Sequence, residues 1–144
     1  MRQLILVRKD LNMSPGKMAA QVSHASMAFL AAQIREKAVL HGVSYTVDLD
    51  IPADVYENWF IGVFAKTVCE AKNRHQLMRA VSLAESLGLQ EERDFFLIRD
   101  YCLTEIEPEE TDKNGEGRTL TCIGFRPLPD EIAHQISYKY QLYR

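Results

Sequence analysis

The 144-residue sequence has few of the residues that build metal sites and disulfide frameworks. Its three cysteines, Cys69, Cys102 and Cys122, are far apart and form no CxxC pair, and its four histidines show no zinc-type spacing. We therefore expect no metal ion and no disulfide framework, and we interpret the cysteines as small buried hydrophobic residues. The sequence also lacks GxGxxG, GxxxxGK(S/T) and GxSxG motifs. It therefore predicts neither a nucleotide cofactor nor a nucleophile elbow.

Long apolar runs are absent as well. No run reaches the ~18 residues that a membrane span needs, and the opening residues MRQLILVRKD contain only a short apolar run between charges. A secretory signal peptide needs a longer apolar core and a cleavage site of small residues. We therefore expect a cytoplasmic protein that has no membrane partner.

The chain has no large excess of either charge, since 17 Lys+Arg against 20 Asp+Glu give a net charge of −3. This balance argues against a protein that coats nucleic acid indiscriminately. The charge is uneven, however: residues 1–41 have six basic and two acidic residues (net +4), whereas residues 101–144 have five and eight (net −3). Such asymmetry allows one local basic face. The length and ordinary hydrophobic content predict a single domain over residues 1–144.

Hydrophobic spacing and helix-end residues predict an alternation of strands and helices. Ser14 is placed to cap a helix that starts at Pro15 and ends before Gly42. Residues 43–58 read as an irregular connection, 107–118 as a polar loop and 138–144 as a last extended piece. The remaining predicted elements are strands at 3–8, 59–68, 94–100 and 119–125 and helices at 70–87 and 130–137.

The predicted order is β-α-β-α-β-loop-β-α. Two helical crossovers make the first three strands parallel, whereas the loop between the third and fourth strands makes the fourth antiparallel. We therefore predict an α/β fold with three layers, α/β/α, around a mixed four-stranded sheet.

Three features of this topology meet at the carboxyl ends of the parallel strands, where open α/β sheets bind ligands. They are the start of the first helix at Lys17, the end of the third strand at Asp100, and the start of the fourth strand with Thr121. Lys17, Gln21 and His24 also lie on one face of the helix because they are spaced by four and three residues. Each residue has an ordinary alternative: a solvated lysine, a turn-forming aspartate and a strand-forming threonine.

The segment LILVRKDLNMSPGKMAAQVSHASMA resembles the start of a type II (archaeal and eukaryotic-type) peptidyl-tRNA hydrolase. That family opens with a strand, then Arg-x-Asp-Leu-x-Met, a Gly-Lys pair, and Ala-Ala-Gln-x-Ser-His-Ala. Weaker matches follow in the same order along the chain. They are Val63 to Lys66 for a Val-rich strand that ends in Lys, then Asp100, Thr104, Ile106 and Pro108, then Thr121, Gly124 and Pro127.

The chain also departs from this family. The family's Ala-Gly-Arg after the aspartate is Tyr101, Cys102 and Leu103 here, so a turn glycine and an arginine are missing. The loop 107–118 is longer and more acidic than the family pattern, and the connection 43–58 is also longer.

The resemblance implies that the chain hydrolyses the ester that joins a peptide to the terminal ribose of tRNA, with no metal. Asp100 would orient and activate a water, Lys17 would supply positive charge, and His24 would move a proton or contact the terminal nucleotide. The implied substrate-binding residues are Arg8, Gln21, Lys66, Thr104 and Thr121.

Two alternatives remain at this point. The altered turn after Asp100 is compatible with a module that binds RNA or a protein without hydrolysis. The acidic loop is compatible with a hydrolase of another small ester or amide. The sequence does not determine the oligomeric state, for which a homodimer, the commonest closed assembly, is one candidate.

Overall fold

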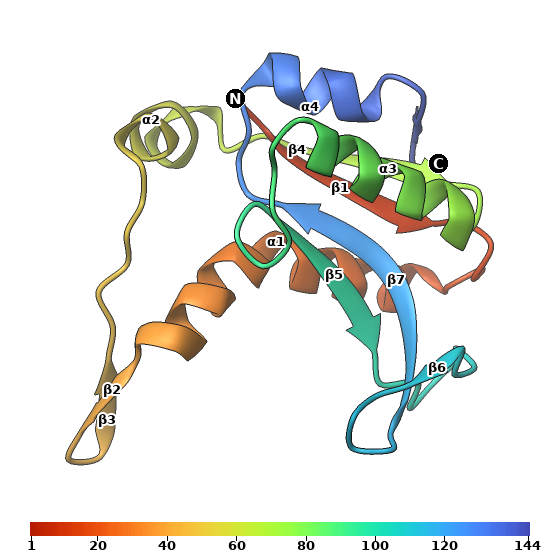
Figure 1. Cartoon of the computed structure of the whole chain (residues 1–144), viewed down its shortest axis with the longest axis horizontal. Helices are drawn as coiled ribbons and strands as arrows, with labels where there is room; N and C mark the ends of the chain where they lie inside the picture. The colour runs from red at the N-terminus through yellow and green to blue at the C-terminus, as the bar shows by residue number, and fades with distance from the viewer.

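The computed structural model describes all 144 residues and has one six-stranded mixed sheet. The strand order is β5-β7-β1-β4-β8, and the short β6 pairs with β7. A separate two-stranded hairpin, β2–β3, projects away from the sheet (Figure 1). In chain order the elements are β1 (Gln3–Arg8), α1 (Pro15–Lys37), β2 (Val39–His41), β3 (Ser44–Thr46), α2 (Ala53–Val55), the helical stretch η1 (Tyr56–Val63), β4 (Lys66–Ala71), α3 (Arg74–Ser86), β5 (Phe95–Asp100), β6 (Glu110–Thr111), β7 (Gly117–Phe125), α4 (Asp130–Ser137) and β8 (Gln141–Leu142).

The strand directions confirm the mixed α/β sheet and correct its details. β1 pairs parallel with β4, while β7 pairs antiparallel with both β1 and β5. The strands β1, β4 and β5 therefore share one direction, as predicted, and β7 runs against them. β7 lies between β1 and β5, however, so the first and third predicted strands are not neighbours. The predicted count of four strands is wrong because β6 and β8 extend the sheet.

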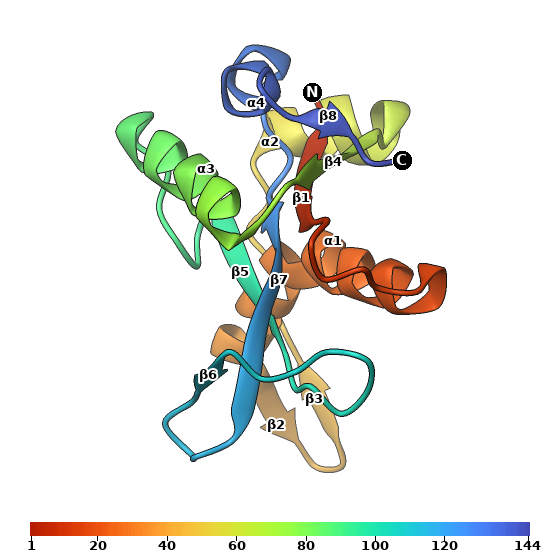
Figure 2. The ribbon, with the colours of Figure 1, turned by 90° about the vertical axis from the view of Figure 1, so that its right-hand side faces the viewer.

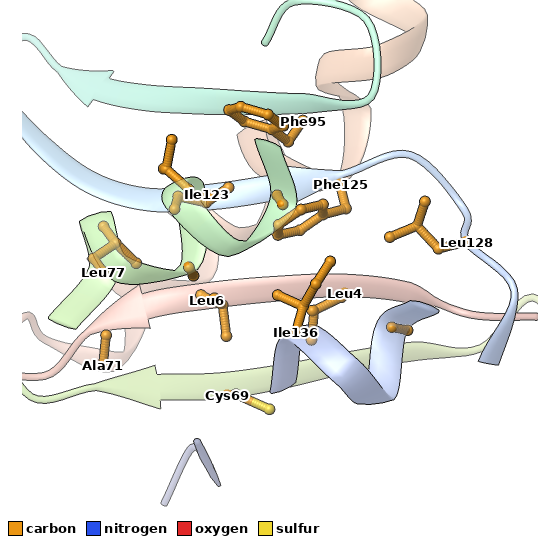
Figure 3. Close-up of a cluster of buried hydrophobic side chains, with 14 of the residues drawn as sticks. Leu4, Leu6, Cys69, Ala71, Leu77, Phe95, Ile123, Phe125, Leu128 and Ile136 are labelled. Carbon is orange, nitrogen blue, oxygen red and sulfur yellow. The ribbon is translucent and has the colours of Figure 1, made fainter. Parts of the chain in front are cut away.

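Helices cover both faces of the sheet, which makes three layers (Figure 2). On one face, Leu4 and Leu6 of β1 pack with α3 and α4, and Leu77 and Ile136 from these helices are fully buried (Figure 3). On the other face, Ile5 and Val7 pack with α1. Alternate residues of β1 thus serve opposite cores, and this explains why its sequence is a continuous apolar run.

Close contact between α1 and the sheet depends on small residues. A Cβ atom at Gly124 of β7 would overlap the backbone carbonyl of Ala25 in α1. Since nothing larger than glycine fits there, α1 lies directly on β7, and its first turns are held beside the ends of β5 and β7.

The segment between α1 and β4 differs most from the prediction. The apolar run 59–68 was predicted as a strand, but its first part is the helical stretch η1, and β4 begins only at Lys66. Trp59 is buried against Phe29 of α1, with ring centroids 6.2 Å apart. A short apolar run does not distinguish a buried helix from a strand, and here the aromatic contact accompanies the helix.

Other boundaries shift by a few residues for local reasons. α1 ends at Lys37, and Gly42, with φ +62°, forms the turn of the β2–β3 hairpin instead of ending the helix. α3 starts at Arg74 because Asn73 caps it and β4 continues through Ala71. The predicted helix 130–137 is confirmed as α4, and the extended piece near the end of the chain contains β8.

The three cysteines are free: Cys69 and Cys122 are buried, as predicted, and Cys102 is half-buried. Burial raises the pKa of the Cys122 thiol to about 12, so this thiol stays protonated. None of the helices combines the length and the apolar character that crossing a membrane requires.

Candidate active site

A continuous chain of four polar side chains lies at the carboxyl end of β5. Asp100 ends this strand, and its Oδ2 lies 2.9 Å from the Nζ of Lys17 in the first turn of α1. The Nε2 of Gln21, one helical turn further on, donates to Asp100 Oδ1 at 2.9 Å. The Thr121 hydroxyl in β7 donates to Gln21 Oε1 at 2.7 Å. The structure thus joins the first turns of α1 to the end of β5 and the middle of β7.

The chemistry of the groups fixes the direction of these hydrogen bonds. An ionised carboxylate only accepts, so the Gln21 amide must turn its NH2 group toward Asp100. The amide oxygen then faces Thr121, whose hydroxyl becomes the donor, with a second acceptor in the Ile98 carbonyl at 3.2 Å. The backbone N–H of Cys102 also donates to Asp100 Oδ2 at 2.9 Å. Three donors therefore hold the Asp100 carboxylate in one orientation.

Exposure divides the four side chains into two pairs. Lys17 and Asp100 are 12% and 11% exposed, so both reach solvent although most of each side chain is covered. Gln21 and Thr121 are buried at 2% and 0%. A molecule in the solvent can touch the first pair, whereas the second pair can act only by holding Asp100 in place.

The start of α1 forms as the sequence predicted. The Ser14 hydroxyl accepts from the backbone N–H of Lys17 at 3.2 Å, and Pro15 occupies the first helical turn. Glu105, 91 residues away in sequence, accepts from the Ser14 N–H at 3.0 Å and from its hydroxyl at 2.7 Å. These bonds lower the pKa of Glu105, so it stays ionised and fastens the loop after β5 to the helix.

That loop carries the residues that depart from the resembled family. Cys102, which replaces the family's glycine, has φ +57°, a backbone conformation that glycine adopts most easily. Thr104 Oγ1 lies 3.4 Å from Lys17 Nζ, at the outer limit of a hydrogen bond. The turn is therefore present without the glycine, and it brings Thr104 to the lysine.

A groove runs from Asp100 along α1 and the edge of β5, and we call it the α1–β5 groove. Its volume is about 390 Å³. The exposed side chain of His24 lines it, so His24 lies at the site but makes no hydrogen bond to Asp100 or Lys17. The groove is lined by Gln21, His24, Met27, Ala28, Ala31 and Arg35 of α1 and by residues 97–101.

A larger cavity of about 500 Å³ lies elsewhere, near Phe29, Phe96 and Arg126. It does not include Lys17, Gln21, Asp100 or Thr121, and its basic side chains are all paired with carboxylates. Arg126, for example, donates to Asp94 at 2.7 Å. The polar chain around Asp100 is therefore the better candidate for chemistry.

Arg8 and Lys66, the implied substrate-binding residues that would suit the tRNA phosphates, do not join the polar chain around Asp100. Arg8 is 3% exposed, and its guanidinium bonds Asp10 at 2.8 Å, Glu109 at 2.6 Å and the carbonyl of Leu120 at 3.0 Å. A phosphate contact does not fit this geometry because two carboxylates already occupy the guanidinium. The hydrogen bond from Arg8 lowers the pKa of Glu109, so the acidic loop is bound to β1 by a structural ion pair.

Lys66 starts β4 rather than ending a strand, and it pairs in register with Gln3 at the start of β1. It therefore lies at the amino ends of these strands, opposite the end of the sheet at which Asp100 lies. Its ammonium group lies 3.4 Å from the centroid of the Phe64 ring, over the aromatic cluster of η1. The predicted strand began seven residues before β4, so Lys66 lies at the start of the strand and not near its end.

Sequence reasoning missed two contributors to the site. Glu105 carried no local pattern that could link it to a serine 91 residues earlier. Tyr101 is 63% exposed next to Asp100, and the Arg118 guanidinium stacks on its ring at 3.4 Å. The only sequence signal for Tyr101 was its place as an aromatic residue directly after Asp100. No group of three or more His, Cys, Asp or Glu side chains is arranged to hold a metal ion.

Comparison with known proteins places this geometry in one family. The family model described as "Peptidyl-tRNA hydrolase PTH2" matches residues 1–143. The chain is 33% identical to a peptidyl-tRNA hydrolase from Methanopyrus kandleri over 99% of this chain and 98% of that protein. It is 29% identical to one from Thermoplasma acidophilum (98% and 97%) and 30% identical to one from Thermococcus onnurineus (94% and 92%). The chain therefore belongs to the PTH2 family of peptidyl-tRNA hydrolases.

Proposed function

We propose that this protein hydrolyses the ester bond of peptidyl-tRNA with Asp100 as the general base and Lys17 as the positive charge beside the reacting carbonyl. The observation that carries the proposal is the pair of Lys17 and Asp100, 2.9 Å apart at the mouth of the α1–β5 groove. Both side chains reach solvent, and both lie where α/β sheets bind ligands.

Asp100 retains a place for the attacking water. Each carboxylate oxygen can accept two hydrogen bonds. Oδ2 already accepts from Lys17 and Cys102, whereas Oδ1 accepts only from Gln21. A water bound to Oδ1 is therefore within reach of an ester carbonyl that lies against Lys17.

The reaction then needs two proton movements. The water oxygen bonds to the ester carbonyl carbon while Asp100 takes one of its protons, and the carbonyl oxygen becomes an oxyanion beside the Lys17 ammonium. When the tetrahedral intermediate collapses, the bond to the ribose oxygen of tRNA breaks. Asp100 returns its proton to that oxygen, so the products are a free peptide acid and free tRNA.

Gln21 and Thr121 act as positioning residues in this scheme. Since both are buried, Gln21 holds Asp100 directly and Thr121 holds Gln21, which revises the expected substrate-binding role of each. Thr104 keeps its expected place at the substrate, because its hydroxyl is exposed beside the Lys17 ammonium. We propose that His24 contacts the terminal nucleotide, because its exposed ring lines the groove about two turns beyond Lys17.

For the tRNA phosphates we propose Lys72 in place of Arg8 and Lys66. Lys72 follows β4, so it lies at the carboxyl ends of the strands, as Asp100 does. Its side chain is exposed, and it has no ion pair. A phosphate contact releases counterions, so its loss should lower the salt dependence of binding.

The experiment for this contact is a matched pair of variants, Lys72→Ala and Lys66→Ala. We expect Lys72→Ala to weaken tRNA binding about two- to fivefold at low salt and to reduce the slope of log affinity against log salt by about 1. Lys66→Ala, at the opposite end of β4, should change neither the affinity nor the salt slope. Equal effects of the two variants would refute the assignment.

The test of the activity itself is release of peptide from purified peptidyl-tRNA by the purified protein in a chelating buffer. We expect free tRNA and free peptide at a rate that falls at least a hundredfold in Lys17→Ala. A wild-type protein that binds peptidyl-tRNA and leaves it intact would favour the binding-module alternative.

A cytoplasmic location and a homodimer are also proposals. The location is supported by the substrate class, since peptidyl-tRNA arises where proteins are translated. Sedimentation of the purified protein at micromolar concentration distinguishes a monomer of 16.5 kDa from a dimer.

A further inference from the structure

The outer side of β5, which lines the α1–β5 groove, is not covered by another strand. β5 is the last strand of the sheet and pairs only with β7 along its length (Figure 1). Near its start, the turn at residues 91–95 covers the edge through a bridge between Glu91 and Phe95. From Leu97 onward no strand pairs with this side of β5.

The backbone of Leu97 points out of this open edge. Residues of an antiparallel pair alternate between those that bond the partner strand and those that do not. The N–H of Arg126 donates to the Asp94 carbonyl at 2.9 Å, so Asp94, Phe96 and Ile98 face β7. The N–H and C=O groups of Leu97, which lies between Phe96 and Ile98, are therefore directed to the groove side, where they lack a strand partner.

We propose that the α1–β5 groove binds the peptide part of the substrate as an added strand on the edge of β5. This inference rests on the proposed function, and it specifies how the acyl side of the ester is held. A peptidyl-tRNA hydrolase meets nascent peptides of every sequence, so backbone hydrogen bonds are the suitable means of recognition. Addition of a strand to an open edge is a known mode of peptide binding that depends on the main chain.

The direction of the bound peptide follows from the position of Asp100. The carboxyl end of the peptide carries the ester, so it must lie at Asp100 and Lys17, at the carboxyl end of β5. The preceding residues then run back toward Leu97, and the peptide is parallel to β5. From Leu97 to Asp100 a strand rises about 10 Å, so the groove holds about three peptide residues.

The lining of the groove suits a peptide better than a nucleic acid. Ala28 and Ala31 of α1 form a small apolar floor that leaves room for varied side chains. Of the two arginines at the groove, Arg99 already pairs with Glu110 at 2.7 Å. A nucleic-acid track needs a row of unpaired basic groups, and the groove does not provide one.

The test uses tripeptides joined to the 3′ position of adenosine through an amide. The amide keeps the planar geometry of the ester and resists hydrolysis. Binding can therefore be measured whether or not the protein is active. One peptide nitrogen at a time is methylated. In a parallel strand only every second N–H group points to the partner strand, so only one of two neighbouring peptide nitrogens can donate to the Leu97 carbonyl. Methylation of that nitrogen should weaken binding about tenfold, and methylation of its neighbour should not. Equal effects at neighbouring positions, or none, would overturn the proposal.

A second measurement uses two variants of α1 that add the same bulk. Ala31→Phe fills the groove, whereas Ala20→Phe adds a ring on the exposed side of the same helix. We expect Ala31→Phe to weaken tripeptidyl-adenosine binding at least tenfold, to leave binding of free tRNA unchanged, and to affect acetyl-aminoacyl-adenosine much less. Ala20→Phe should resemble the wild type, and both melting temperatures check folding.

The outcomes separate this inference from the proposed function. Loss of free tRNA binding in Ala31→Phe would extend the tRNA site past His24 to Ala31, into the part of the groove assigned to the peptide, and overturn the strand model. Hydrolysis of peptidyl-tRNA with no dependence on peptide methylation would overturn the strand model alone. Alternating methylation effects in a protein that hydrolyses nothing would leave the peptide site standing and overturn the hydrolase assignment.

Discussion

Replacement of Asp100 by asparagine is the change that most directly separates catalysis from structure. The amide has the shape of the carboxylate but cannot take a proton from water. Loss of a general base lowers a rate by about 10²–10⁴, which corresponds to ~3–5 kcal/mol of barrier. We therefore expect kcat of Asp100→Asn to fall by at least a hundredfold.

The structure also predicts how the asparagine is accommodated. Its oxygen belongs beside Lys17 and the Cys102 N–H, which both donate, so its NH2 group faces Gln21. The Gln21 amide then turns over, and its NH2 group faces the Thr121 hydroxyl. That hydroxyl can accept from Gln21 because it has a second acceptor for its own proton, the Ile98 carbonyl at 3.2 Å.

The cost to stability is therefore limited to the ion pair with Lys17. Exposed pairs contribute about 0.2–1 kcal/mol, and loss of one partner of a fully buried pair costs about 3–5 kcal/mol. Lys17 and Asp100 are each about one-tenth exposed but remain in contact with solvent, so we expect a loss of about 1–2 kcal/mol. In a chain of this length, such a loss lowers the melting temperature by about 3–6 °C.

The assay compares kcat, substrate binding and melting temperature in Asp100→Asn, the wild type and a matched control. Asp10→Asn is the control because Asp10 is also paired with a basic side chain, Arg8, but lies outside the α1–β5 groove. The control should keep its kcat. A lower melting temperature of Asp100→Asn with kcat within threefold of the wild type would show that Asp100 is structural, and His24 would become the next candidate base.

The remaining predictions concern the frame around the site. Arg8→Ala should destabilise the fold by about 2–3 kcal/mol, because it leaves Asp10 unpaired and leaves Glu109 with only the longer contact to Arg74 at 3.3 Å, and should leave the salt dependence of tRNA binding unchanged; a shallower salt slope would restore Arg8 as a phosphate ligand. Since Arg8 holds the pKa of Glu109 below its usual value, the folded state binds this proton less readily than the unfolded chain. The stabilisation is complete above the unfolded pKa near 4.3 and is lost as pH falls through the lower folded value, so unfolding curves of the wild type and Arg8→Ala should converge in acid. Gly124→Ala should cost about 3 kcal/mol or more because its Cβ meets the backbone of Ala25, whereas Gly16→Ala, with open space around it, should cost nothing measurable in thermal unfolding.

The parts of the fold that local chemistry determines were predictable from the sequence. β1, β5, β7 and α4 lie within two residues of their predicted bounds, because the three strands are mainly apolar segments and α4 begins directly after Pro129. The stretch from residue 39 to residue 65 was not predictable. Its helical stretch η1 coincides with an aromatic contact between Trp59 and Phe29, 30 residues apart, which no local pattern reports.

The candidate site was also predictable only where local pattern determines the position of a residue. Lys17, Gln21 and Asp100 were found because helix spacing and strand order place them at one edge of the sheet. Arg8 was expected at a phosphate because a basic residue at the end of a strand resembles a phosphate ligand unless its partner is known. That partner, Glu109, lies 101 residues later in a loop without a secondary-structure pattern.

The loop after Asp100 shows why departure from a family pattern does not by itself remove a site. Its missing glycine would matter if the turn could not form, but Cys102 adopts φ +57° and its N–H still reaches Asp100. Such a conformation costs a non-glycine residue about 1 kcal/mol, and the two bonds from Ser14 to Glu105 can offset a cost of that size. The missing arginine is a different matter, since Leu103 in its place is 86% exposed and offers no charge. The contacts that hold the Asp100 carboxylate therefore form without the glycine, and under the proposed function the change falls on the charge that the turn offers to tRNA.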